Sequence, residues 1–250
     1  RDTDRSRGLG DVYKRQTQKG YIKRIALDNF ENIRRNGIIA IGLEEGDTLC
    51  WVKQAQDNDE VIIGTSCGMA IRFPIADLRP LGRSARGVNS MKLRSADKII
   101  GCDIVPRNYD ADLLVVTSDG FGKRSKLSDF RTQNRGGLGL IATKFKSSQS
   151  RLVALTIVEE KDEIMVVTQN GVVTRIKADC ISRQGRPATG VRIQNLGDGD
   201  MVCTVNKIVD PDSDDDKIDC DLPKEAGAEN NSVQQSILGG LTENTDETKE

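Results

Sequence analysis

The chain has 250 residues, of which 37 are Lys or Arg and 38 are Asp or Glu, and its formal net charge is -1. It contains no His, which excludes a Ser-His-Asp or Cys-His nucleophile and a His-ligated zinc site built from this chain. No apolar run reaches the roughly 18 residues that span a bilayer, and no signal peptide begins the chain, so we expect a cytoplasmic protein without a membrane partner.

The first sixteen residues are unlike the rest. Their run Asp11-Val12-Tyr13-Lys14-Arg15-Gln16 looks like the translation of a sequencing-library adapter. Residues translated from an adapter do not belong to the native protein and are left out when its fold is predicted. We therefore predict that residues 1–16 are not native and lie outside the fold; the alternative is a genuine basic N-terminal arm.

Residues 17–208 repeat themselves. A Thr-x-x-Gly element occurs four times, with its glycines 48, 52 and 51 residues apart, at Thr17/Gly20, Thr65/Gly68, Thr117/Gly120 and Thr168/Gly171. A second glycine follows in each repeat, at Gly37, Gly87, Gly139 and Gly190. Two landmarks that share one period of about 50 residues predict tandem structural repeats.

Within each repeat the side chains alternate with a period of two, which indicates strands and disfavours helical repeats. The fifth and seventh positions after the first glycine are mostly apolar and are expected in the core, whereas the fourth, always Arg, is expected to face water. The pattern predicts an all-β fold, a β-propeller-like β-pinwheel of four-stranded blades. Because the first repeat lacks its opening strands, we expect an incomplete disc, an open arc with exposed strand edges.

Residues 209–250 hold 13 acidic and 3 basic residues, a net charge of -10, which leaves +7 on residues 17–208. The segment has few large apolar residues and no periodicity, so we predict a disordered acidic tail. A basic body with an acidic tail indicates a protein that binds a polyanion.

Three basic segments, at residues 20–25, 120–124 and 171–175, resemble the C-terminal domain of the A subunit of DNA gyrase. The resemblance covers residues 17 to about 208 and implies roughly the last four blades of a β-pinwheel. It further implies wrapping of double-stranded DNA, in support of ATP-dependent negative supercoiling by a holoenzyme. The implied partners are the gyrase B subunit and a second A subunit, with ATP and Mg on other domains and no cofactor in this fragment.

The family's diagnostic box, Gln-Arg-Arg-Gly-Gly-Lys-Gly, is missing, and residues 133–139 hold a degenerate copy, Gln-Asn-Arg-Gly-Gly-Leu-Gly. Two alternatives therefore stay open: the C-terminal domain of the A-type subunit of topoisomerase IV, and a propeller that acts only as a protein-interaction platform. Type IIA topoisomerases cut DNA with a tyrosine next to an arginine. Tyr13, Tyr21 and Tyr109 have no such neighbour, so we expect no catalytic residue here.

Cations at equivalent places in successive repeats could neutralise DNA phosphates along one rim without reading bases. One candidate set comprises the repeat arginines and a lysine beside them: Arg24, Arg72, Arg124, Arg175 and Lys123. The other lies in the loops ahead of the second glycine: Arg34, Arg35, Arg83, Arg86, Arg131, Arg135, Arg183 and Arg186. We favour the loop set, because the family's box occupies that loop.

Two of these loops, residues 82–87 and 185–190, have the glycine spacing of a phosphate-binding P-loop. Both are followed by Val where the motif needs Lys and then Ser or Thr, so we predict no nucleotide site. The six cysteines contain no C-x-x-C pair, and we expect no metal site either.

Overall fold

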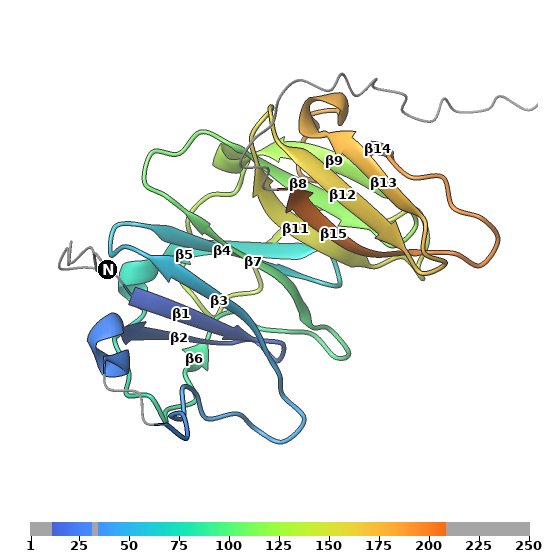
Figure 1. The fold of residues 1–250 in the computed structure, drawn as a ribbon. Coiled ribbons are helices and arrows are strands. Elements are labelled where there is room, and N and C mark those ends of the chain that lie inside the picture. The colour runs from blue at the N-terminus through green and yellow to red at the C-terminus, as the bar shows by residue number, and fades with distance from the viewer. Residues whose placement is uncertain (1–11, 32–34, 209–250) are drawn as a thin grey trace, which may run out of the picture.

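The computed structural model describes residues 12–31 and 35–208, which form a chain of β-strands and short 3-10 turns (Figure 1). Each repeat folds into a hairpin around its Thr-x-x-Gly turn: β1 (Val12–Thr17) with β2 (Tyr21–Ala26), β4 (Glu60–Thr65) with β5 (Met69–Pro74), β8 (Asp112–Thr117) with β9 (Phe121–Lys126), and β12 (Glu163–Thr168) with β13 (Val173–Lys177). A 3-10 turn follows each hairpin: η1 (Leu27–Phe30), η2 (Ile75–Asp77), η3 (Leu127–Asp129) and η4 (Ala178–Cys180). Within these ranges no helix is long and apolar enough to cross a bilayer.

Each hairpin is flanked by one long strand, and three of the four also by a strand of two residues. The long strands are β3 (Leu49–Ala55), β7 (Ile99–Val105), β11 (Leu152–Val158) and β15 (Val202–Ile208); the short ones are β6 (Val88–Asn89), β10 (Leu140–Ile141) and β14 (Val191–Arg192). The resulting sheets have the orders β3-β1-β2-β6, β7-β4-β5-β10, β11-β8-β9-β14 and β15-β12-β13. The predicted all-β pinwheel of roughly four-stranded blades is confirmed.

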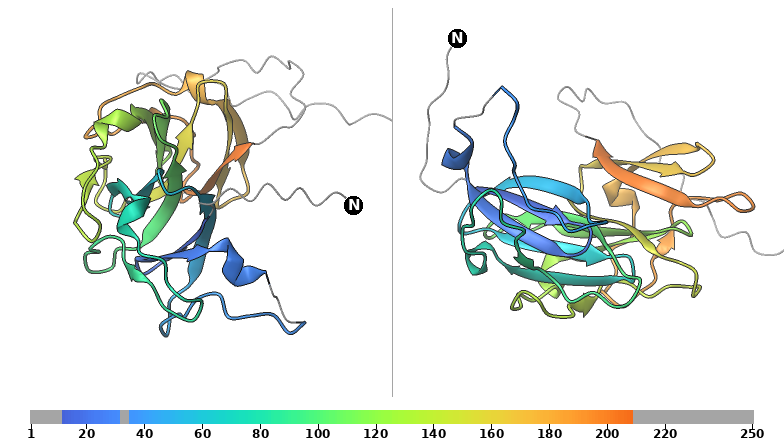
Figure 2. Two further views of the ribbon diagram at one scale, coloured as in Figure 1. Left: turned by 90° about the vertical axis from the view of Figure 1, so that its left-hand side faces the viewer. Right: turned by 90° about the horizontal axis from the view of Figure 1, so that it is seen from below.

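The short strand of each four-stranded sheet comes from the following repeat. Strand β6, for example, pairs with β2 of the preceding repeat, with Tyr21 opposite Asn89 and Ile22 opposite Val88. Strand β10 pairs with β5 and β14 with β9 in the same way. The long strands β3, β7, β11 and β15 neighbour one another in that order, and the sheets stand side by side around an arc (Figure 2). The short strands therefore mark the outer edge of the arc.

The repeated threonine builds the hairpin turn in two ways. In the third repeat the Gly120 N–H donates to the Thr117 carbonyl at 3.1 Å, and the Phe121 N–H donates to the Thr117 hydroxyl at 3.3 Å. Gly120 has a φ of 80°, in the left-handed region that glycine adopts without steric cost. The Thr-x-x-Gly spacing thus encodes a closed turn between two strands.

The second glycine lies where one repeat presses against the blade before it. A Cβ on Gly139 would stand 2.4 Å from the Ala70 carbonyl oxygen, and one on Gly190 would stand 2.5 Å from that of Gly122. No side chain fits at such distances. This close approach allows the short strands β10 and β14 to reach the preceding sheet.

The core lies between neighbouring blades. Every residue of β8 is buried, and so are the apolar residues of β4, as expected for strands covered on both faces. The fifth position after the first glycine is buried in all four repeats, including Ile25, Phe73 and Ile176. Packing of successive sheets therefore buries the apolar runs that the sequence contains.

The N-terminal segment differs from expectation. Residues 12–17 form strand β1, paired with β2 and β3, so the prediction that residues 1–16 lie outside the fold is wrong for residues 12–16. Any extended segment can make these backbone hydrogen bonds. Its side chains suit the place poorly, because Lys14 Nζ and Gln16 Oε1 are buried and have no hydrogen-bond partner in the described structure. The adapter origin stays a prediction, and residues 1–11 and 209–250, with the predicted tail, lie outside the described residues.

Candidate nucleic-acid interface

The four repeat arginines form ion pairs, three of them within their own blades. Arg72 Nε lies 2.6 Å from Glu60, Arg124 Nη1 lies 3.0 Å from Asp112, and Arg175 Nε lies 2.6 Å from Glu163. In each case the carboxylate belongs to the first residue of the partner strand in the hairpin. The first repeat has Val12 at that place, and Arg24 instead pairs with Asp57.

Three of these arginines also reach the next repeat. Arg24 donates to the Leu78 carbonyl at 3.5 Å, Arg72 to that of Leu127 at 3.0 Å and Arg124 to that of Ile181 at 2.8 Å. Each acceptor lies in or just after the 3-10 turn that follows the next hairpin. These side chains therefore join adjacent blades.

The expectation that the repeat arginines face water is wrong for three of the four. The side chains of Arg24, Arg72 and Arg124 are only 11%, 18% and 7% exposed. Alternation does turn them away from their own core, but the next blade covers that face. Arg175, in the last described sheet, is 46% exposed. DNA contact by these residues stays a prediction, which the burial of the first three disfavours.

The loop arginines are mostly exposed. Arg35, Arg86, Arg131, Arg135 and Arg183 are exposed, Arg83 and Arg186 are half-buried, and Arg34 lies outside the described residues. Within the described structure, no side-chain hydrogen bond or ion pair engages Arg83 or Arg131. Arg86 pairs with Glu44 and lies 4.4 Å from the centre of the Tyr21 ring. Most of this set is thus open to a ligand.

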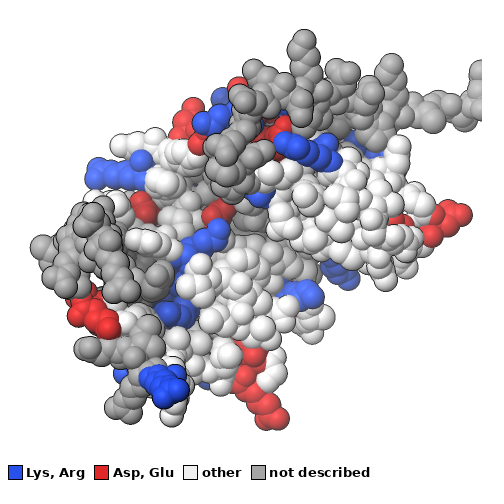
Figure 3. All heavy atoms as spheres, viewed as in Figure 1, with Lys and Arg blue, Asp and Glu red and all other residues white. Residues whose placement is uncertain are grey.

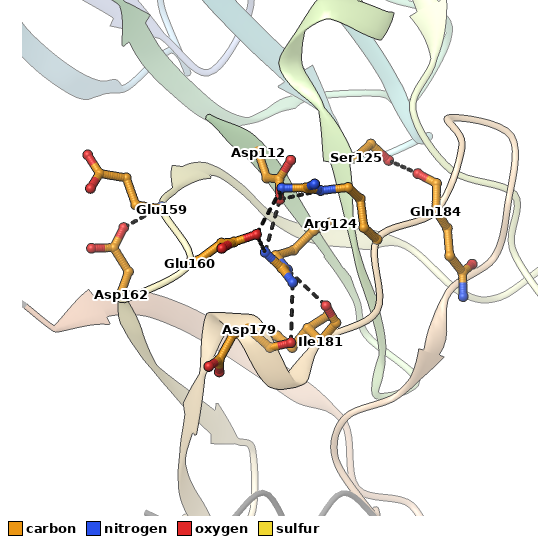
Figure 4. Close-up of polar contacts among 10 residues, drawn as sticks. Asp112, Arg124, Ser125, Glu159, Glu160, Asp162, Asp179, Ile181 and Gln184 are labelled. Atoms are coloured by element: carbon orange, nitrogen blue, oxygen red, sulfur yellow. Dashed lines mark hydrogen bonds and ion pairs between the residues drawn. The ribbon is translucent and has the colours of Figure 1, made fainter. Parts of the chain in front are cut away.

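Arg183 is the member of the loop set most firmly held by the protein. Its Nε donates to the buried Asp112 carboxylate at 2.9 Å, and its Nη2 lies 3.3 Å from Glu160. Hydrogen bonding to Asp112 raises the pKa of Arg183, which keeps it charged. Asp112 also holds Arg124 (Figure 4), so one carboxylate is shared by two arginines from neighbouring repeats. Arg183 is therefore partly a structural residue.

The loops follow one another along the outer edge of the arc, because each leads into a short strand. Arg135 in the loop before β10 donates to the Asn89 carbonyl of β6 at 3.3 Å. Arg186 in the loop before β14 donates to the Ile141 carbonyl of β10 at 3.4 Å. The last two basic loops thus each touch the short strand of the loop before them. Figure 3 shows basic side chains scattered over one face, with acidic side chains among them and no single basic patch.

Comparison with known proteins assigns the family. The family described as "DNA gyrase C-terminal domain, beta-propeller" matches residues 16–53, 59–106, 111–159 and 162–206, once for each repeat. The chain belongs to this gyrase family. The DNA gyrase A subunit of Synechocystis is 44% identical over 221 residues, which cover 76% of this chain and 26% of that protein. Its counterpart from Staphylococcus aureus MRSA252 is 41% identical over 203 residues, or 81% of this chain and 23% of that protein.

The chain therefore spans about a quarter of the length of these gyrase subunits. Among solved structures, a DNA gyrase A C-terminal domain matches with a TM-score of 0.70 and 28% identity, over 81% of this chain and 67% of that one. The C-terminal domain of a DNA topoisomerase IV matches with a TM-score of 0.76 but 22% identity, over 83% and 64%. That second likeness concerns the fold. The gyrase relatives decide against the topoisomerase IV alternative.

The sequence analysis did not predict the structural role of the lysine that lies three residues after the first glycine of a repeat. Lys23 and Lys123 are fully buried, and each donates to backbone carbonyls of a basic loop in the next repeat. DNA contact by Lys123 stays a prediction, which its burial disfavours. A signal existed in the sequence, because this position holds Lys, Ile, Lys and Thr in the four repeats and so does not follow the expected alternation.

Proposed function

We propose that the chain binds duplex DNA along the outer edge of its arc and bends it, as the C-terminal part of a gyrase A subunit. In the whole protein this wrapping would support ATP-dependent negative supercoiling together with the gyrase B subunit and a second A subunit. The observation that carries the proposal is that basic loops lead into the short strands, and that the last two of them, with Arg135 and Arg186, each touch the short strand before them. Cations set at intervals along a convex edge attract the phosphates of a curved duplex.

The chemistry of these loops suits the phosphate backbone better than bases. Arginine forms two parallel hydrogen bonds to a phosphate and stays charged throughout the working pH range. Bending 20 to 30 base pairs by 40 to 90 degrees costs on the order of 1 to 6 kcal/mol, which several such interactions can offset. Aromatic residues make up only 4% of the chain, too few for a platform that stacks single-stranded bases.

The test measures the affinity of the full chain for a mixed-sequence duplex over a range of salt concentrations. We compare the unchanged chain with the double variant Arg131→Glu, Arg135→Glu in the loop before β10. The matched control, Arg94→Glu with Lys98→Glu, changes the same charge at exposed positions in the turn before the inner strand β7. The loop variant should bind all sequences more weakly, with a salt slope lower by roughly 0.9 for each phosphate that it no longer neutralises.

Two results would contradict the proposal. Equal weakening by the loop variant and its control would mean that only net charge matters. A shallow salt slope for the unchanged chain would favour the alternative, a platform for protein partners.

A further inference from the structure

Two buried lysines hold the basic loops from beneath. Lys23 in β2 and Lys123 in β9 are each 0% exposed. Lys23 Nζ donates to the carbonyls of Ala40 at 3.2 Å, Ala85 at 2.7 Å and Arg83. Lys123 Nζ donates to the carbonyls of Gly185 at 2.7 Å and Arg186. In both blades the ammonium thus binds the backbone of an arginine in a loop contributed by the next repeat.

These hydrogen bonds invert the geometry that the glycine spacing suggests. A P-loop turns its N–H groups inward around an anion, whereas loops 82–87 and 185–190 turn carbonyl oxygens inward around an ammonium group. The interior of each loop is therefore already occupied by a cation. Anions are left to the outer side, where Arg86 is exposed and Arg83 and Arg186 are half-buried.

The second blade shows that a loop at this place does not need a lysine to fold. Its equivalent residue is Ile71, whose side chain lies beneath Gly137 of loop 133–139. That loop is fixed by backbone hydrogen bonds, from Gln133 to the Arg72 carbonyl and from Gly136 to the Ser90 carbonyl, both 2.8 Å. Burying a charge carries a free-energy cost that Ile avoids, so stability alone does not explain the two lysines.

We propose that Lys23 and Lys123 are positioning residues for DNA wrapping. Each fixes the backbone of a loop, so that Arg83 and Arg86, or Arg186, are presented to the phosphodiester backbone already ordered. The inference rests on the proposed function. Because ordering a side chain on binding costs about 0.5 to 1.5 kcal/mol, a loop that is ordered beforehand binds phosphate more tightly.

A pH dependence follows from the same geometry. Burial lowers the pKa of Lys23 and of Lys123 to about 8, an effect that Arg15 reinforces at Lys23 and Arg186 reinforces at Lys123, where Asp129 opposes it. Both lysines are therefore mostly charged at pH 7 and mostly neutral at pH 9. A neutral amine holds carbonyl oxygens less strongly than an ammonium, so the loops loosen over this interval. Over this pH interval the unfolded chain binds more protons than the folded chain, because its lysines keep their ordinary pKa. These two lysines therefore make the free energy of unfolding rise with pH.

The experiment replaces Lys23 and Lys123 with Met in the full chain, and uses Ile71→Met as the matched control. We expect duplex affinity at pH 7 to fall roughly 2- to 10-fold for each lysine variant and to stay unchanged for the control. Amide hydrogen exchange in residues 82–87 or 185–190 should become faster in the corresponding variant without DNA. The unchanged chain should lose affinity between pH 7 and pH 9, and the double lysine variant should lose less.

Folded lysine variants that keep the affinity and the loop protection of the unchanged chain would overturn the inference. If a variant does not fold, the pH series on the unchanged chain decides: loop exchange that is no faster at pH 9, after correction for intrinsic rates, would overturn it. The proposed function is tested separately, by the salt dependence of DNA binding in the loop-arginine variants. Hydrogen exchange tests only whether the lysines order the loops, because it is measured without DNA.

Discussion

At the residue scale, Asp112 is a buried carboxylate that two arginines share. It is 3% exposed and accepts hydrogen bonds from Arg124 and Arg183, which belong to different repeats. The sequence showed the arginine at a fixed place in every repeat but offered no reason to expect it inside the protein. The acidic residue that begins β4, β8 and β12 supplies that reason, since only pairing makes a buried guanidinium tolerable.

Replacing Asp112 with Asn should lower the free energy of unfolding by about 3 to 5 kcal/mol, because buried Arg124 would lose the charged carboxylate that it hydrogen-bonds and keep only the exposed Glu160, 4.0 Å away. Glu163→Gln is the matched control at the same place in the last described blade, where Arg175 is 46% exposed. That change should cost only about 0 to 1 kcal/mol. Urea unfolding measures both, and equal losses would show that Arg124 does not depend on the pair.

Lys14 in strand β1 is a charged residue at a buried position. Ile62 and Leu114 occupy the same register in β4 and β8 and are fully buried. Burial lowers the pKa of Lys14 to about 7, and its Nζ has no hydrogen-bond partner in the described structure. A segment that evolved in this place would not be expected to carry it.

Lys14→Ile should therefore raise the free energy of unfolding by about 1 to 3 kcal/mol at pH 7. Because the folded pKa lies below the unfolded value, Lys14 makes the unchanged chain gain stability as pH rises from about 7 to 10, and the variant should lose this slope. Lys98→Ile, at an exposed turn, should change stability by less than about 0.5 kcal/mol. Destabilisation by Lys14→Ile would show that β1 does not lie in this buried register.

At the element scale, three of the four hairpins could be predicted and the short strands could not. Thr-x-x-Gly turns preceded by apolar runs are local signals, and the structure places the hairpins β4–β5, β8–β9 and β12–β13 there. The β1–β2 hairpin was missed because β1 lacks such a run and lies in residues predicted to be outside the fold. Strands β6, β10 and β14 contain two residues each, too few to show a period. Their partner strands belong to the preceding repeat, so the local sequence cannot predict which strand each of them pairs with. For the same reason, alternation alone could not show that a neighbouring blade covers Arg24, Arg72 and Arg124.

Gly139 and Gly37 allow the close approach between repeats to be tested. Their φ angles are 78° and 77°, so an alanine suffers the same backbone strain at either position. A Cβ on Gly139 would lie 2.4 Å from the Ala70 carbonyl oxygen, whereas one on Gly37 meets nothing within 4 Å. Gly139→Ala should therefore cost about 1 to 3 kcal/mol more than Gly37→Ala. Equal costs in urea unfolding would mean that close approach to the preceding blade is not why this glycine recurs.

At the scale of the whole molecule, the period of about 50 residues predicted the fold, and three basic segments within the repeats predicted the family. The loop arginines were identified as candidates from their place before the second glycine, and in the structure the loops before β10 and β14 each contact the short strand before them. Their contact with DNA stays a prediction. Which cations stay exposed depends on packing between blades and on ion pairs that join distant residues. Lys123 and Arg183 show how far that packing departs from what spacing alone indicates.

The central claim is that this outer edge curves DNA, and DNA topology tests it most directly. Relaxed circular plasmid is incubated with the full chain and a type I topoisomerase, and the linking-number distribution is read after the protein is removed. Curvature along the arc should shift the distribution in one direction in proportion to bound protein, and the Arg131→Glu, Arg135→Glu variant should shift it less at equal occupancy. A chain that binds the plasmid and leaves the distribution unshifted would contradict the account.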